Sequence, residues 1–165
     1  MDPGPGAELV GDAPAGEAVA AVKPLPKSDQ ALVLRTDFSD EAAWHAIRSA
    51  IEAPVREIGA TIDFFAYVTF VDDPDYGDLD TTQIRDLFGP GSNQSFVIVV
   101  DRTAISHPEH PVLVLDLFDP SSQTFRALPW AVQAIENNLS LSNMDFEEFA
   151  GAVDEDGVFR GFPSN

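Results

Sequence analysis

Four short segments of this chain are almost entirely apolar, and they constrain the fold more than any other feature of the sequence. The segments are residues 31–34, 64–71, 96–100 and 112–118. Their apolar residues follow one another without the alternation expected of a strand that has one face in water. Such continuous runs are typical of strands covered by helices on both faces. We therefore expect an α/β fold with a buried sheet.

Segments with helical spacing separate the first three runs. Ser39 is expected to cap a helix that ends before Pro54, and a short helix is predicted over 81–88. A helix between two strands allows those strands to run parallel. The first three strands are therefore expected to be mostly parallel.

The second half of the chain is predicted to hold a hairpin and two helices. Turn-forming residues follow the fourth run, so that strand and a fifth over 124–128 are expected to pair antiparallel. One helix is expected to begin near Pro129. The last helix is predicted over 144–153, with Ser142 or Asn143 as its cap.

These elements predict one three-layer α/β domain. It would contain a mostly parallel or mixed sheet of about five strands, an antiparallel hairpin at one edge, and two C-terminal helices. The direction of the fourth strand relative to the third stays open, because residues 101–111 fit either a short crossover or a wide hairpin loop.

The first 30 residues differ in composition from the rest. They contain 5 Pro, 4 Gly and 6 Ala, and no aromatic residue. Such a segment cannot bury enough apolar surface to offset the entropy lost on ordering. We expect residues 1–30 to be a flexible Ala/Gly/Pro-rich segment and residues 31–165 to be a single acidic domain.

The chain has a formal net charge of −19 and no cysteine. Of its 28 acidic residues, 23 lie after residue 30, so the acidity belongs to the predicted domain. This charge argues against direct binding of nucleic acid or of anionic membranes. The absence of cysteine excludes disulfides, thiolate zinc sites and a cysteine nucleophile. No secretory signal is recognisable at the start, and a cytoplasmic location is expected.

Carboxylates follow three of the predicted strands. Asp37, Asp72, Asp73 and Asp101 would meet at one edge of a parallel sheet, where ligands bind in α/β proteins. They could hold Mg²⁺ and support phosphoryl transfer or hydrolysis. The structural alternative is that these residues cap helices or begin turns, and we favour it. We expect no cofactor, with Mg²⁺ as the alternative.

Known catalytic motifs do not fit this sequence. It has no Gly-x-Ser-x-Gly nucleophile elbow, and residues 89–92 lack the lysine of a phosphate-binding loop. Both possible calcium-loop registers, around Gly77 and Gly157, place the wrong residues at ligand positions. The sequence therefore favours a protein without catalytic activity.

Recognition by charge is the function that the sequence favours. Six acidic residues fall within twelve positions near the C-terminus, with no basic residue among them: Asp145, Glu147, Glu148, Asp154, Glu155 and Asp156. Such a surface attracts a basic protein partner, as inhibitors and immunity proteins do. Acidic surfaces also serve solubility alone. We expect a non-catalytic protein-interaction module.

Several segments carry a resemblance to a family of small acidic actinomycete proteins that share a domain of unknown function. The matching stretches include residues 34–40, 70–74, 100–104 and 107–111, and the most specific are 136–140 and 143–149. The resemblance covers about residues 31–162. It implies a single α/β domain of bacterial cytoplasmic type and brings no catalytic residue with it.

Overall fold

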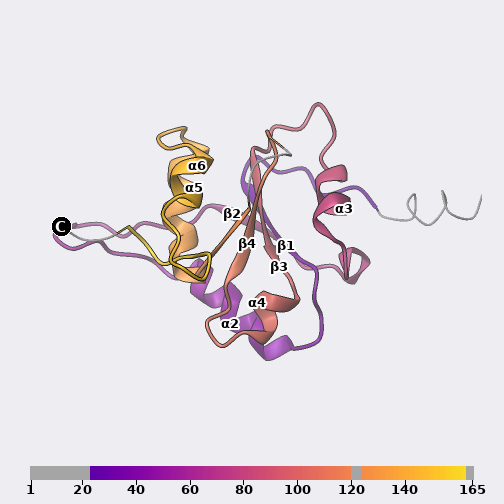
Figure 1. Ribbon diagram of the computed structural model, residues 1–165, viewed down its shortest axis with the longest axis horizontal. Coiled ribbons are helices and arrows are strands. Elements are labelled where there is room, and N and C mark those ends of the chain that lie inside the picture. Colours follow the sequence, from indigo (N-terminus) through magenta and orange to yellow (C-terminus); the bar gives the residue numbers. More distant parts are fainter. Residues whose placement is uncertain (1–22, 120–123, 163–165) are drawn as a thin grey trace, which may run out of the picture.

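The computed structural model describes residues 23–119 and 124–162, which form a mixed sheet with helices on both faces (Figure 1). The sheet has six strands in the order β2-β1-β3-β4-β5-β6. Their bounds are β1 (Ala31–Arg35), β2 (Val68–Val71), β3 (Phe96–Val100), β4 (Val112–Asp116), β5 (Phe125–Ala127) and β6 (Val158–Phe159).

The sheet contains both parallel and antiparallel pairs. Strand β1 lies at the centre of a parallel trio, with Val33 opposite Phe70 of β2 and Ile98 of β3. Strands β3 and β4 are antiparallel, as are β4 and β5, whereas β5 and β6 are parallel. The predicted α/β class with a mixed sheet is thereby confirmed.

One detail of the predicted sheet is wrong, namely the position of the antiparallel hairpin. The sheet has a sixth strand, because Val158 and Phe159 pair with the outer side of β5. The hairpin of β4 and β5 is therefore not at the edge. The sequence left open whether residues 101–111 form a short crossover or a hairpin loop. They join the antiparallel strands β3 and β4 and contain the short helix α4 (Arg102–Ser106).

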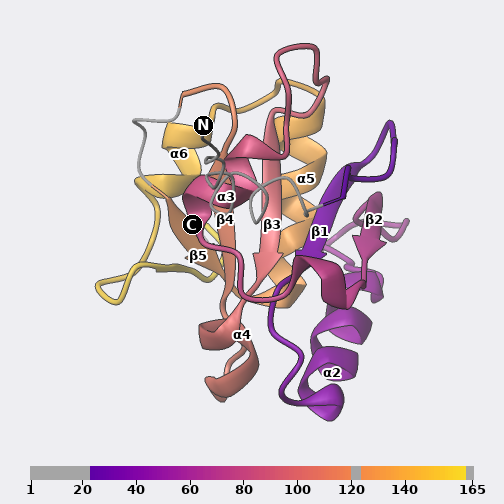
Figure 2. The same cartoon turned by 90° about the vertical axis from the view of Figure 1, so that its right-hand side faces the viewer.

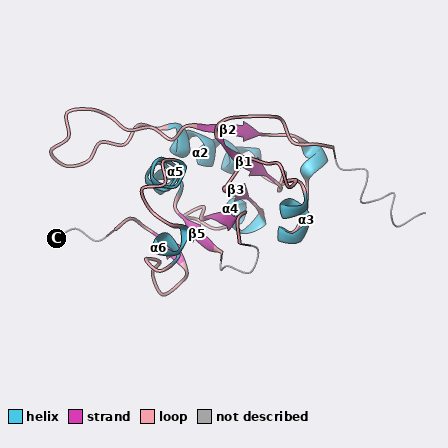
Figure 3. Ribbon diagram, turned by 90° about the horizontal axis from the view of Figure 1, so that it is seen from above, coloured by secondary structure: helices cyan, strands magenta, loops and turns pink. Residues whose placement is uncertain are grey.

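The helices divide between the two faces of the sheet (Figures 2 and 3). One face is covered by α2 (Glu41–Glu52), α5 (Val132–Ser140) and α6 (Phe146–Ala150). The other is covered by α3 (Thr81–Asp86) and the turn η2 (Pro74–Tyr76). A further turn, η3 (Pro129–Ala131), leads into α5 where a helix start was predicted.

Each face of the sheet has its own apolar core. Val33 and Ile98 pack in the core beneath Trp44 of α2, whereas Leu32 and Leu34 pack in the core beneath α3. All five residues of β1 are buried, as are all five of β3. The continuous apolar runs thus correspond to strands covered on both faces.

Two helix caps differ from the predicted ones. The cap of α2 is Asp40, whose carboxylate accepts the N–H of Ala43 at 3.1 Å, and not Ser39. The cap of α6 is Asp145, and not Ser142 or Asn143. In each case an aspartate one to three residues further along is the residue at the helix start.

The described part of the N-terminal segment contacts the domain. The hydroxyl of Tyr76 donates to the carbonyl of Pro24 at 2.7 Å, Leu25 packs on the α3 core, and Ser28 hydrogen-bonds Thr69. Residues 1–22 lie outside the described residues, so the predicted flexibility of this segment stays a prediction there. Within the described ranges, no helix has the length and apolar character needed to cross a membrane.

Candidate functional site

The parallel strands β1, β2 and β3 end at one edge of the sheet, which we call the carboxyl edge. The chain passes from β1 through α2 to β2, then through α3 to β3 on the other side of β1. The connections lie on opposite faces, so the strand order reverses between β1 and β3. Ligands of open α/β sheets bind beside such a switch point.

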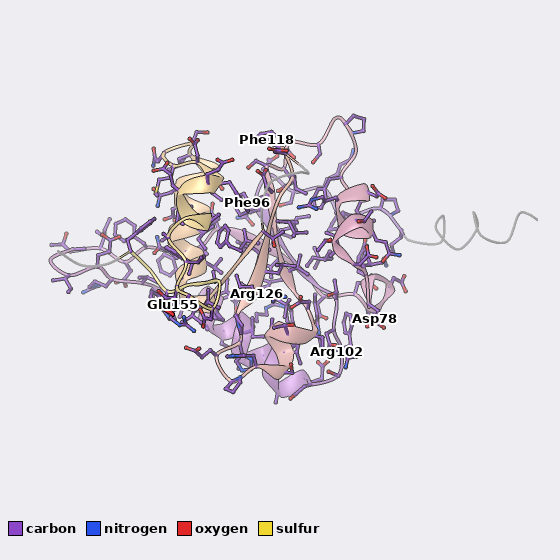
Figure 4. The ribbon with its side chains drawn as sticks, in the orientation of Figure 1. Asp78, Phe96, Arg102, Phe118, Arg126 and Glu155 are labelled. Atoms are coloured by element: carbon purple, nitrogen blue, oxygen red, sulfur yellow. The ribbon has the colours of Figure 1, made fainter. Side chains whose placement is uncertain are left out.

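Two adjoining depressions lie at this switch point, with volumes of about 350 and 240 Å³. Thr36, Asp37, Asp78 and Arg102 line both of them. Figure 4 shows Asp78 and Arg102 together at the lower end of the sheet. The side chain of Arg102 is 81% exposed, and Asp78 has a φ of 61°, a left-handed conformation that only a minority of non-glycine residues adopt.

Asp37 is the most buried carboxylate at this edge. It accepts hydrogen bonds from the N–H of Ser39 at 3.0 Å and from the Ser39 hydroxyl, and Arg102 Nε lies 3.7 Å from its other oxygen. Burial by itself would raise the pKa of Asp37, but these hydrogen bonds and the nearby arginines outweigh it and lower the pKa. Asp37 is therefore ionised at neutral pH.

Arg35, at the end of β1, is the partner of Asp72. Its guanidinium is buried and donates to Asp72 Oδ1 at 3.0 Å, to the backbone carbonyl of Asp37 at 3.0 Å, and to Glu41. The ring of Phe38 lies 4.2 Å from the guanidinium carbon and stacks on it. This arrangement ties the loop after β1 to the loop after β2.

The other two predicted ligands also have structural partners. Asp73 caps η2 by accepting the N–H of Asp75 at 2.9 Å, and it pairs with Lys23. Asp101 caps α4 and accepts two hydrogen bonds from Arg126, at 3.0 and 2.8 Å. A bidentate pair of this kind fixes both side chains.

The structure thus places all four aspartates at the carboxyl edge but gives each of them a separate partner. Among the described residues, no three His, Asp or Glu side chains are close enough together to hold a metal ion. The sequence analysis missed Arg35 and Arg126, because the contact of Asp101 with Arg126 spans 25 residues and leaves no periodic signal.

The six acidic residues between 145 and 156, which we call the acidic surface, lie on α6 and on the loop between α6 and β6. All six are exposed. The N–H of Asp145 donates to Glu148 at 2.9 Å, so this pair stabilises the start of α6. Glu147 and Glu155 take part in no ion pair within the described residues.

Arg160 holds part of the acidic surface in place. Its guanidinium contacts Asp154 at 2.8 Å, Asp156 at 2.8 Å and Glu109, from the loop before β4, at 2.7 Å. The hydrogen bonds from Arg160 lower the pKa of Asp156 and of Glu109, and the pKa of Arg160 is raised in turn. Arg160, which follows β6, therefore connects the loop between α6 and β6 to the loop before β4 through ion pairs.

The fold and site define a mixed-sheet α/β domain with an ion-paired carboxyl edge and an acidic surface. A family model described as a domain of unknown function (DUF6924) matches residues 30–162. The chain belongs to this family. The match agrees with the resemblance that the sequence segments carry, which covered about residues 31–162. No curated protein matches the chain.

Proposed function

We propose that this chain is a non-catalytic protein-interaction module whose acidic surface binds a basic region of another protein in the cytoplasm of a bacterial, and specifically actinomycete, cell. The observation that carries the proposal is the exposure of six carboxylates on α6 and the loop after it, with Arg160 as their cationic neighbour. A fixed array of this kind attracts cationic partners and speeds their association.

The use of the arginines supports this proposal. Six arginines lie in ion pairs with carboxylates of the same chain: Arg35, Arg48, Arg56, Arg102, Arg126 and Arg160. Arg85 donates to the backbone carbonyl of Asp116. These arginines contact acceptors of the same chain. The carboxylates that remain in excess are therefore exposed to solvent and to any binding partner.

The carboxyl edge supports a role without catalysis. A catalytic metal site needs carboxylates with oxygens free for the ion. Asp72 and Asp101 instead pair with Arg35 and Arg126. These contacts position the loops of the sheet, and a metal ion would have to compete with two guanidinium groups.

The depressions at the switch point favour a second candidate, a Mg²⁺-dependent enzyme for phosphoryl transfer or hydrolysis. Asp37 and Asp78 line both depressions, and Asp101 lines one of them. This candidate requires Mg²⁺ to bind there, which a thermal melt tests directly (see Discussion).

The interaction proposal is tested with two variants of equal net charge. Glu147→Gln/Glu155→Gln removes two carboxylates of the acidic surface that make neither an ion pair nor a side-chain hydrogen bond within the described residues. Asp29→Asn/Asp86→Asn removes two exposed carboxylates elsewhere. Each protein is immobilised, exposed to extract of its own cells, and the bound proteins are identified by mass spectrometry.

We expect the wild type and the Asp29/Asp86 variant to retain the same basic protein, and the Glu147/Glu155 variant to retain much less of it. Added salt should release that protein, because screening weakens attraction between charges. Equal retention by both variants, or no basic protein retained at low salt, would count against the proposal.

A further inference from the structure

The loop between α2 and β2 extends away from the sheet and helices (Figures 1 and 3). This projecting loop comprises residues 53–67. Val55 and Phe64 donate their N–H groups to each other's carbonyls, both at 2.8 Å, and Arg56 pairs with Asp63 at 2.7 Å. The loop is therefore a short hairpin with its own cross-links.

The base of the projecting loop is attached to α5. Glu136 accepts the N–H of Tyr67 at 2.7 Å, and the side chain of Asn137 donates to the carbonyl of Phe65 at 2.9 Å. Glu136 is itself buried. These contacts orient the loop relative to the body of the domain.

Apolar side chains on the projecting loop face solvent. Ile58 is 102% exposed, Ile62 61%, Phe65 42% and Tyr67 59%. Among the described residues, eight large hydrophobic side chains are exposed, and these four fall within a stretch of ten positions. A concentration of exposed apolar surface is typical of a protein–protein interface.

The loop leads into a strand with a free edge. Strand β2 is terminal in the sheet, and no described strand pairs with its outer side. Residues 64–71 contain no charged residue and no proline. Natural proteins usually protect such edges with lysine, proline or a covering segment. An unprotected, apolar, aromatic-rich edge indicates that another strand covers it.

The charge distribution indicates that this strand comes from a second copy of the chain. Two copies that each carry a charge of −19 repel each other over most of their surfaces. The stretch from Phe64 to Val71 is neutral, and residues 53–71 carry a net charge of only −1, because Arg56 pairs with Asp63 and Glu57 remains. A basic partner would be drawn to the acidic surface instead. An apolar surface with so little charge can pack against an identical surface without strong repulsion.

We propose that the projecting loop and the outer edge of β2 bind the same surface of a second copy, so that the chain forms a homodimer. A two-fold axis makes identical strands antiparallel, so β2 of one copy pairs with β2 of the other and the two sheets become continuous. This dimer does not depend on the proposed binding of a basic protein.

The test measures molar mass by light scattering after size-exclusion chromatography, over a wide range of concentrations. Ile62→Lys/Tyr67→Lys places like charges on the proposed interface. Phe118→Lys/Leu141→Lys is the matched control, because those side chains are 82% and 72% exposed and lie elsewhere. Since all four positions are exposed, we expect both variants to fold and the control to melt close to the wild-type temperature. The Ile62/Tyr67 variant should melt at a lower temperature than the wild type at high protein concentration, because it loses the stabilisation that association gives the folded chain.

The wild type and the control should have twice the mass of one 17.8 kDa chain, and the Ile62/Tyr67 variant the mass of one. Added salt should strengthen the dimer because it screens the repulsion between copies. Salt has the opposite effect on a basic partner, so the two kinds of binding are distinguishable. A monomeric wild type, or two variants with the same mass, would overturn the proposal.

Discussion

At the scale of single residues, the partner of each carboxylate decides its role, and the sequence does not reveal that partner. Arg160 meets Asp156 four positions away but meets Glu109 across 51 residues. The first contact follows from local spacing, whereas the second exists only because β6 lies beside β5. For this reason the sequence predicted where acids are concentrated but not which of them are paired.

Replacing Arg160 by glutamine should destabilise the protein at neutral pH and much less in acid. The hydrogen bonds from Arg160 lower the folded-state pKa of Asp156 and Glu109. The stability that these groups contribute is present above their unfolded pKa values, near 4, and is lost as the pH falls through the folded values. Thermal melts of both proteins from neutral pH to acid measure this difference.

Arg48→Gln is the control for this experiment. Arg48 pairs with Glu52 at 3.8 Å, and its guanidinium also lies over the ring of Phe70, a contact that does not depend on the ionisation of a carboxylate. We expect any difference between its melting temperature and that of the wild type to be the same at every pH. If the Arg160→Gln difference were the same at neutral and acid pH, the ionised carboxylates would not be its cause.

At the scale of helices and strands, the local pattern of apolar residues predicted the buried strands well, but it missed short elements. Continuous apolar runs identified β1, β3 and β4, because each is buried on both faces. Strand β6 has two residues, too few for a pattern, and it forms only because β5 offers a free edge. Residues 64–67 look like a strand but lie before β2, where α5 holds their backbone.

The assignment of Asp145, and not Ser142 or Asn143, as the N-cap of α6 can be tested by mutation. Asp145→Ala should lower the free energy of unfolding by about 1 kcal/mol, the usual effect of removing an N-cap side chain. Asn143→Ala should have a much smaller effect, because the backbone N–H of Asn143 is what bonds Asn138. Urea unfolding of both variants measures the difference. Equal losses would show that Asn143 stabilises the helix as much as Asp145 does.

The carboxyl edge of the sheet provides a test of the two candidate functions. A metal site filled at 100 times its dissociation constant adds about 2.7 kcal/mol, which raises the melting temperature by several degrees. Because Asp72 and Asp101 are paired with arginines, we expect Mg²⁺ to shift the wild type no more than it shifts Asp72→Asn/Asp101→Asn. A shift confined to the wild type would favour the enzyme.

At the scale of the whole molecule, the balance of charge predicts how salt affects stability. The chain has 28 acidic and 9 basic residues, so repulsion between carboxylates opposes the compact state. Salt screens this repulsion, and it also weakens the ion pairs of the arginines. The acids far outnumber the pairs, and we therefore expect the melting temperature to rise as NaCl is added.

The size of this rise should depend on Arg160. In Arg160→Gln, Glu109, Asp154 and Asp156 lose the cation that they share, and repulsion among them remains. Its melting temperature should therefore rise more steeply with NaCl than that of the wild type, and the two curves should converge at high salt. Parallel curves would show that Arg160 acts through packing and not through charge. A wild-type melting temperature that falls with salt would show that attraction within the ion pairs exceeds the repulsion among the remaining acids.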